Sequence, residues 1–150
     1  MSGVRVRRAA AADLGAWTAM RLALWPGSDA GELRGEAEAI LQDPRDMAAF
    51  VAEGDGKVVG LAEASLRCEY VNGTLTSPVG FLEAWYVAPE WRGQGAGRAL
   101  LATVEDWTRG HGCSELASDA LIDNLGSRAA HEACGFEGTG QVVYFRKPVR

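Results

Sequence analysis

The stretch "FLEAWYVAPEWRGQGAGRALL" at residues 81–101 decides the fold. Its first part is rich in aromatic and β-branched residues and stops at Pro89, which is typical of a strand. Its last part continues to Gly110 with the apolar spacing of an amphipathic helix. Glycines at 93, 95 and 97 lie between the two, and glycine serves where the backbone needs unusual dihedral angles or a close approach to another molecule.

A strand, a glycine-rich turn and the start of a helix together form an anion site, because the first N–H groups of a helix lack internal partners. We expect the N–H groups from about Gly93 to Gly97 to face phosphate oxygens, with Arg92 adding positive charge. The P-loop, which needs Lys followed by Ser or Thr, does not fit this stretch, and neither does the Rossmann glycine spacing. The alternative is a plain glycine-rich loop that leads into a helix.

The rest of the chain alternates between strand and helix patterns. The clearest signal is a hairpin, since Asp55-Gly56 is a preferred two-residue turn between apolar runs. The polar residues 68–78 are either a loop or a hairpin tip. Strands are expected at 4–9, on both sides of Asp55-Gly56, and at 79–89, 113–118 and 139–149, with helices at 13–25, 29–43, 97–110 and 124–136. This order predicts an α/β (α+β) fold, a mixed sheet with helices on both faces.

Length, charge and cysteine use exclude several classes of protein. The 150 residues fit one domain over 1–150, and 47% hydrophobic residues supply a core. The net charge of −5 without a basic run argues against nucleic-acid binding and suits a cationic substrate. The sequence contains no window of about 20 apolar residues, so no membrane span is predicted. The cysteines at 68, 113 and 134 have neither disulfide nor metal spacing, so we expect reduced thiols, no metal and a cytoplasmic location.

Residues 92–97 match the [RQ]-x-x-G-x-[GA] signature of the GNAT superfamily of N-acetyltransferases, which the chain resembles over nearly its whole length. The resemblance implies a mixed, mainly antiparallel sheet of about six to seven strands flanked by about four helices. It also implies acetyl-CoA as co-substrate, with Asn124 on the CoA side or serving only as a helix cap. The implied cofactor-binding residues are Tyr86, Val87, Arg92, Gly93, Gln94, Gly95, Ala96, Gly97, Arg98 and Asn124, the first two through backbone groups that pair with pantetheine.

A narrower resemblance, to the short aminoglycoside 6'-N-acetyltransferases, lies outside this loop. It is carried by "LALWPG" (22–27), "RCEYVNG" (67–73), "SPVGFLEAWYV" (77–87), "ELASD" (115–119) and "VVYFRK" (142–147). It implies acetyl transfer to the 6'-amino group of an aminoglycoside, and a homodimer. The alternatives are a GNAT enzyme for another small amine, a polyamine or a protein amine, and a module that binds acyl-CoA without catalysis.

An amine acceptor must lose a proton before it attacks, and a carboxylate can both attract the ammonium and take that proton. Glu83 is the first candidate, sharing a strand face with Phe81 and Trp85; its alternatives are a solvent-facing carboxylate or one paired with an arginine. Asp119 is the second candidate, because it ends a strand at the edge where an α/β crevice usually opens. Its alternative role is the cap of a helix. The resemblance makes Trp25 a wall that stacks on a sugar ring and Tyr70 a hydroxyl donor, although both residues could serve packing alone.

The departing CoA thiolate needs a proton or a hydrogen-bond donor unless it leaves unaided. The wider family often has a tyrosine where this chain has His131, so the general acid is open. His131 and Tyr144 are the two candidates, and for both the alternative is a structural role.

Overall fold

The computed structural model describes residues 3–150. One sheet holds β1 (Arg5–Arg8), β2 (Met47–Gly54), β3 (Lys57–Arg67), β4 (Val79–Val87) and β5 (Leu116–Ala117), in that spatial order. The first three pairings are antiparallel and the β4–β5 pairing is parallel. The prediction of a mixed, mainly antiparallel sheet is therefore confirmed.

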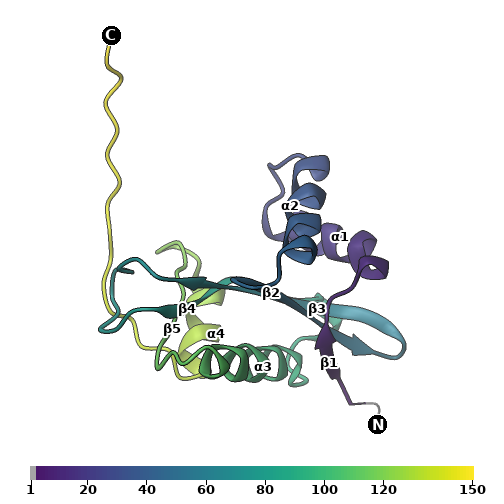
Figure 1. Cartoon of the computed structure of the whole chain (residues 1–150). Helices are drawn as coiled ribbons and strands as arrows, with labels where there is room; N and C mark the ends of the chain where they lie inside the picture. Colours follow the sequence, from purple (N-terminus) through teal and green to yellow (C-terminus); the bar gives the residue numbers. More distant parts are fainter. Residues whose placement is uncertain (1–2) are drawn as a thin grey trace.

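The helices lie on both faces of the sheet (Figure 1). α1 (Leu14–Leu24) and α2 (Ala30–Gln42) cover one face, and α3 (Ala96–Gly110) and α4 (Leu125–Ala133) lie on the other. Two short 3-10 turns, η1 (Ala11–Asp13) and η2 (Pro89–Trp91), precede α1 and α3. The four predicted helices are thus all present, with ends that differ from the prediction by a few residues.

Each face has its own apolar core. Under α3, Leu100 and Val104 pack with Phe50 and Leu82 of the sheet. Under α1 and α2, the second core combines helix and strand residues: Trp17, Ala37, Ile40, Val51 and Leu61. The β2–β3 hairpin turns as predicted at Asp55 (φ 51°) and Gly56 (φ 74°), both left-handed.

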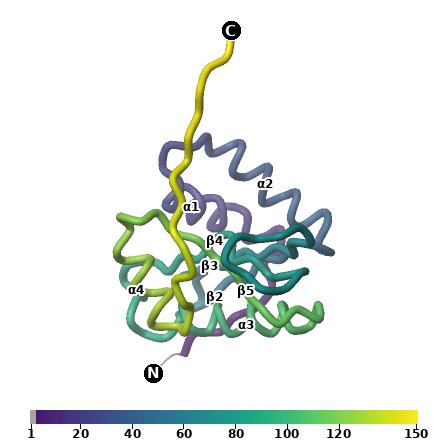
Figure 2. The backbone as a smooth tube through the Cα atoms, turned by 90° about the vertical axis from the view of Figure 1, so that its left-hand side faces the viewer, coloured from purple at the N-terminus to yellow at the C-terminus, as the bar shows by residue number. Residues whose placement is uncertain are grey.

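The described residues contain a five-stranded sheet rather than one of six to seven strands, because the expected last strand at 139–149 does not form. Residues beyond Ala133 contain no regular element, and the end of the chain extends away from the sheet (Figures 1 and 2). Strand propensity stabilises a strand only when a ladder partner is available, and this segment meets none within residues 3–150. The strand expected at 113–118 is shortened to Leu116–Ala117.

One irregularity in β4 controls the direction of its side chains. Glu63 pairs with Ala84 but Ala64 pairs with Leu82, so Glu83 is the extra residue of a β-bulge. Beyond the bulge the alternation is reversed: Trp85 packs in the core under α3, whereas Glu83 contacts Ser65 and Arg67 of β3. The prediction that Glu83 shares a face with Trp85 is wrong, because strict alternation assumes a strand without a bulge.

Among residues 3–150, no helix is both long enough and apolar enough to cross a membrane.

Candidate active site

The glycine-rich loop connects β4 to α3 in the way that an anion site requires. Gly93 (φ 76°) and Gly95 (φ 92°) both have left-handed backbones, which side chains other than glycine rarely adopt. Gly95 is the N-cap of α3 and supplies no side-chain cap. The N–H of Ala99 donates to the Gly95 carbonyl at 3.0 Å, so the N–H groups that precede it in the first turn remain available for a ligand.

Gly97 has a different task from the other two glycines. A Cβ at this position would lie 3.5 Å from the Trp85 ring, and the indole N–H of Trp85 donates to the Gly97 carbonyl at 3.0 Å. The start of α3 therefore lies directly against Trp85 of β4, at a distance that a Cβ would fill as an ordinary van der Waals contact. This contact fixes the direction in which the N-terminus of the helix points.

Polar side chains hold the loop in place. Arg92 donates through Nε to the Val87 carbonyl at 2.8 Å, and Gln94 donates to the Glu90 carbonyl at 3.1 Å. Arg98 reaches across to the Ala133 carbonyl at the end of α4, at 3.0 Å. Both arginines are partly or fully exposed beside the loop, so they add positive charge next to the free N–H groups.

The two strands beside the loop separate. β5 pairs with β4 only at Gly80 and Phe81, and within the described chain no strand pairs with this edge of β4 over residues 82–87. The predicted pantetheine partners, Tyr86 and Val87, lie on this open edge. The Val87 carbonyl is already occupied by Arg92.

Glu83 lies on the other side of the sheet in a small polar cluster. It accepts hydrogen bonds from the Ser65 hydroxyl at 2.5 Å and from Arg67 at 2.8 and 3.0 Å. The Arg67 guanidinium also stacks over the Phe81 ring at 3.6 Å. The alternative in which Glu83 pairs with an arginine is therefore realised, and both side chains of the pair remain partly exposed.

Asp119 and Glu83 are at the same level of the sheet. Ala117 pairs with Phe81 in the parallel β4–β5 ladder. Glu83 lies two residues after Phe81, and Asp119 lies two residues after Ala117. Asp119 is exposed, in the loop after β5. Glu83 and Asp119 therefore both lie at the level where β5 ends and separates from β4.

Trp25 is the C-cap residue of α1, and a buried ion pair holds it in place. Arg21 stacks on the Trp25 ring at 5.3 Å and donates to both oxygens of Glu63, at 2.7 and 2.6 Å. Trp17 donates to the same carboxylate at 2.7 Å. Burial alone would lower the pKa of Arg21, but its hydrogen bonds to Glu63 and the charge of Glu63 raise it.

The sequence reasoning did not identify the Arg21–Glu63 pair. The signal was an arginine on the apolar face of a helix, four residues after Trp17, together with a glutamate inside an otherwise apolar strand. Buried charges are almost always paired, so each of them predicts a partner.

Tyr70 is 72% exposed in the loop at 68–78. Glu115 holds this loop against the start of β5, accepting from the Thr76 hydroxyl and from the N–H groups of Leu75 and Thr76 at 2.9 and 2.6 Å. These hydrogen bonds, first that of the Thr76 hydroxyl, hold the pKa of Glu115 below its usual value. The segment is the long loop at the tip of the β3–β4 hairpin, because Arg67 and Val79 on either side of it are paired.

Asn124 and His131 belong to α4. Asn124 caps the helix, accepting from the Ser127 N–H at 3.1 Å, so its helix-cap role is realised. His131 Nδ1 lies 2.7 Å from the Ser127 carbonyl, which can only accept, so Nδ1 carries the proton of the neutral ring. Nε2 lies 2.8 Å from the Ser118 hydroxyl. Trp85 and Phe136 contact the ring edge-on.

Tyr144 is not brought to these residues within its own chain. It is 89% exposed, and the segment around it extends away from the sheet (Figure 2). Its role as a proton donor therefore stays a prediction.

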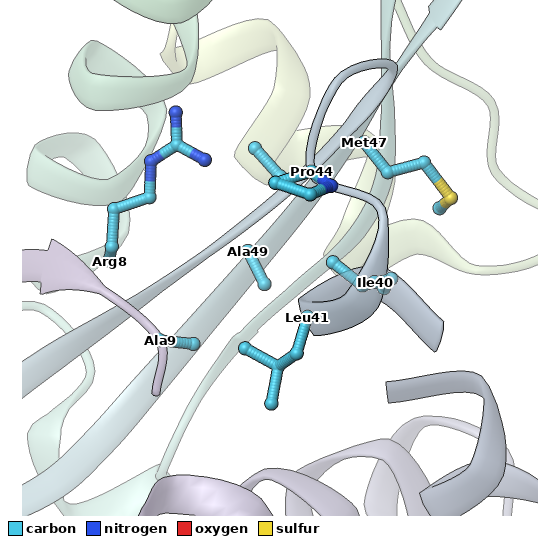
Figure 3. Close-up of a pocket in the computed structure, with 8 residues that line it drawn as sticks. Arg8, Ala9, Ile40, Leu41, Pro44, Met47 and Ala49 are labelled. Atoms are coloured by element: carbon cyan, nitrogen blue, oxygen red, sulfur yellow. The ribbon is translucent and has the colours of Figure 1, made fainter. Parts of the chain in front are cut away.

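A cavity of about 210 Å³ lies apart from all of these groups, between the end of α2 and strands β1 and β2 (Figure 3). It is lined by Arg8, Ala9, Ile40, Leu41, Pro44, Met47, Ala48 and Ala49, none of which is a predicted site residue. Among residues 3–150, no group of three or more His, Cys, Asp or Glu side chains is arranged to hold a metal ion.

The left-handed glycines before α3 and the open edge of β4 together fit a phosphate-bearing cofactor. Residues 16–136 match the model of the acetyltransferase (GNAT) family. The chain belongs to this family, which confirms the resemblance drawn from residues 92–97.

Within the family, the chain is similar to aminoglycoside acetyltransferases. The chain is 51% identical to an aminoglycoside N(6')-acetyltransferase type 1 from Stenotrophomonas maltophilia, over 99% of this chain and 95% of that protein. It is 48% identical to the protein of the same name from Serratia marcescens, over 90% and 92%. The structure of AAC(6')-Iy with the bisubstrate analog CoA-S-monomethyl-acetylneamine superposes with a TM-score of 0.92 at 39% identity, covering 99% of this chain and 100% of that one.

Proposed function

We propose that this protein transfers the acetyl group of acetyl-CoA to the 6'-amino group of aminoglycosides. One observation carries the proposal: β4 presents Glu83 toward the α1 side of the sheet and then runs directly into the glycine cradle. A single strand thereby links a carboxylate for a cationic acceptor to a site for the pyrophosphate of the donor. The similarity to aminoglycoside N(6')-acetyltransferases supports the choice of acceptor.

On the donor side, the N–H groups in the first turn of α3 would bind the pyrophosphate, with Arg92, Gln94 and Arg98 around it. The pantetheine arm would lie along the open edge of β4, where backbone groups of Tyr86 and Val87 pair with its amides. Arg92 would release the Val87 carbonyl as it turns toward phosphate. Asn124 would remain the cap of α4 and face the CoA side.

On the acceptor side, Glu83 and Asp119 would attract the aminoglycoside ammonium groups, and Trp25 and Tyr70 would contact a sugar ring. The ammonium would replace Arg67 at Glu83 and lose a proton to that carboxylate, directly or through one water. The free amine then attacks the thioester carbonyl. The C–N bond forms, the C–S bond breaks, and the sulfur leaves as the CoA thiolate. The attacking nitrogen also gives up one more proton, which balances the proton that the thiolate takes up to become the CoA thiol.

Protonation of the thiolate completes the reaction. The Nδ1 proton of neutral His131 is held by the Ser127 carbonyl, so His131 would act as an acid only when it is doubly protonated. Tyr144 would act only if its segment were brought to the site. The thiolate is also stable enough to leave without an acid.

We further propose that residues 1–150 form one N-acetyltransferase domain and that the protein is a cytoplasmic homodimer. Acetyl-CoA is a cytoplasmic metabolite, and Cys68, Cys113 and Cys134 all carry free thiols.

The test is release of free CoA thiol across a panel of aminoglycosides with and without a 6'-amino group. Turnover is expected only with the 6'-amino compounds, and mass spectrometry should find one added acetyl group at that position. Turnover with polyamines or protein amines alone would contradict the acceptor and keep the enzyme class. Binding of acetyl-CoA without turnover of any amine would contradict catalysis itself.

A further inference from the structure

Ser118 and His131 form a hydroxyl–imidazole pair beside the open edge of β4. The Ser118 Oγ lies 2.8 Å from His131 Nε2, and the Ser127 carbonyl lies 2.7 Å from Nδ1 on the other side of the ring. Because a carbonyl only accepts, Nδ1 carries the proton of the neutral ring and Nε2 accepts from the Ser118 hydroxyl. A hydroxyl that donates to an unprotonated imidazole nitrogen is a nucleophile beside its base.

Neighbouring groups fix the direction of this imidazole. Trp85 contacts the His131 ring edge-on at 5.4 Å between ring centroids, and Phe136 does so at 5.0 Å. Together with the Ser127 carbonyl, they keep Nε2 facing Ser118. A nucleophile, a base and a group that orients the base are the three parts of an acyl-transfer site. Here a backbone carbonyl takes the place that a carboxylate has in serine hydrolases.

Ser118 lies where the proposed donor would present its thioester. Its Oγ is 3.4 Å from the Leu82 carbonyl, at the level where β5 ends and separates from β4. The glycine cradle follows Val87, so a pantetheine arm that runs back along this edge of β4 brings its reactive end toward residue 82. Ser118 and His131 are both half-buried, so neither is sealed from a bound arm. The inference therefore rests on the proposed donor site.

We propose that Ser118 is a second acetyl acceptor and that the protein slowly hydrolyses acetyl-CoA when no amine occupies the acceptor site. Ser118 Oγ attacks the thioester carbonyl and gives its proton to His131 Nε2. The O–C bond forms, the C–S bond breaks, and the sulfur takes the proton from Nε2 to leave as the CoA thiol. The acetyl group remains as an ester on Ser118.

Water completes the cycle. A water molecule gives a proton to His131 Nε2 as its oxygen attacks the ester carbonyl. The bond between the carbonyl carbon and Ser118 Oγ breaks, and Oγ recovers the proton from Nε2. The products are free CoA and acetic acid, which ionises, and no oxidant or reductant is needed. Direct attack by a bound amine with Glu83 as its base needs neither the ester nor Ser118, so the two reactions can be measured apart.

The first experiment measures release of the CoA thiol from acetyl-CoA with no amine present. Ser118→Ala and, separately, His131→Gln should each lower this rate by about 100-fold or down to the uncatalysed rate, because the nucleophile or its base is lost. Ser114→Ala, at an exposed serine before β5, is the matched control and should keep the rate within about threefold. Circular dichroism and the acetyl-CoA dissociation constant establish that each variant folds and binds the donor.

The second experiment detects the ester itself. The full chain is mixed with acetyl-CoA labelled in its acetyl group, quenched in acid, digested and mapped by mass spectrometry. One acetyl group on Ser118 is expected, and it should be absent from the His131→Gln variant.

Three results would each overturn the proposal: no thiol release above the uncatalysed rate, release that persists in Ser118→Ala, or release without a label on Ser118. Turnover of aminoglycosides is a separate measurement. The proposed acceptor can therefore fail while the hydrolysis stands, and the hydrolysis can fail while the acceptor stands.

Discussion

The proposed donor site and the proposed acceptor site of this protein are built in opposite ways. The proposed donor site is one continuous segment, β4–η2–α3, in which the glycine conformations at 93 and 95 leave the N–H groups of a helix open to a ligand. The proposed acceptor site combines four segments that are distant in sequence, at Trp25, Tyr70, Glu83 and Asp119. A backbone site depends on local geometry, whereas a side-chain site depends on everything that holds its segments in register.

The two sites should therefore tolerate substitutions to different degrees. A substitution distant from the donor loop should leave acetyl-CoA binding intact as long as β4 and α3 remain packed. The acceptor side should respond to changes in buried residues that touch no substrate, because those residues place α1 and β3.

The largest expected effect concerns the buried support of the acceptor side. Arg21→Met leaves the Glu63 carboxylate buried without its partner and should lower the free energy of unfolding by about 3–5 kcal/mol. Urea unfolding followed by circular dichroism measures this loss. The matched control is the double variant Arg21→Met/Glu63→Gln, which removes both charges, keeps an acceptor oxygen for the Trp17 N–H and should recover most of the stability. A loss below about 1 kcal/mol in the single variant would contradict the assignment.

The next effect concerns the donor side alone. Gly95→Val requires a β-branched residue to adopt φ 92° and should weaken acetyl-CoA binding by about 100-fold through strain and loss of the cradle. Isothermal titration calorimetry gives the dissociation constant. Gly35→Ala, at an open position in α2, serves as control and should change nothing. Unchanged cofactor affinity in the valine variant would rule out the phosphate cradle.

Glu83→Gln tests the acceptor side without changing side-chain volume. kcat/KM for the aminoglycoside should fall by about 100-fold, the low end for general-base catalysis, while the acetyl-CoA dissociation constant stays the same. Steady-state thiol release measures the first quantity and calorimetry the second. Glu38→Gln on the exposed side of α2 is the matched control. An effect smaller than threefold would remove Glu83 from the catalytic residues.

The smallest expected effect concerns the ion pair between Arg67 and Glu83. Arg67 occupies Glu83 in the absence of substrate, so Arg67→Ala should lower the KM of the cationic acceptor by up to about fivefold and leave kcat nearly unchanged. Initial-rate kinetics with a 6'-amino aminoglycoside would reveal this. A raised KM would mean that Arg67 helps to bind the acceptor instead of competing with it.

Sequence reasoning succeeded where one segment carried the whole signal. The β4–loop–α3 unit, the Asp55-Gly56 turn and the four helices follow from apolar spacing, glycine positions and breakers, all of which are local. The predicted face of Glu83 was wrong, because that face depends on a bulge relative to β3. The strand predicted at 139–149 was also wrong, because its pattern meets no partner strand within the described residues. Pairing partners cannot be read from the pattern of one strand.

By itself, the sequence determined the family, the cofactor loop and the order of elements, because each rests on short-range backbone preferences and on motifs of adjacent residues. Only the tertiary structure decided that Glu83 points toward Ser65 and Arg67 and that Arg21 is neutralised by Glu63. Those facts depend on pairing between strands and on helix placement over the sheet. They result from long-range packing, in which residues distant along the chain fix one another's environment.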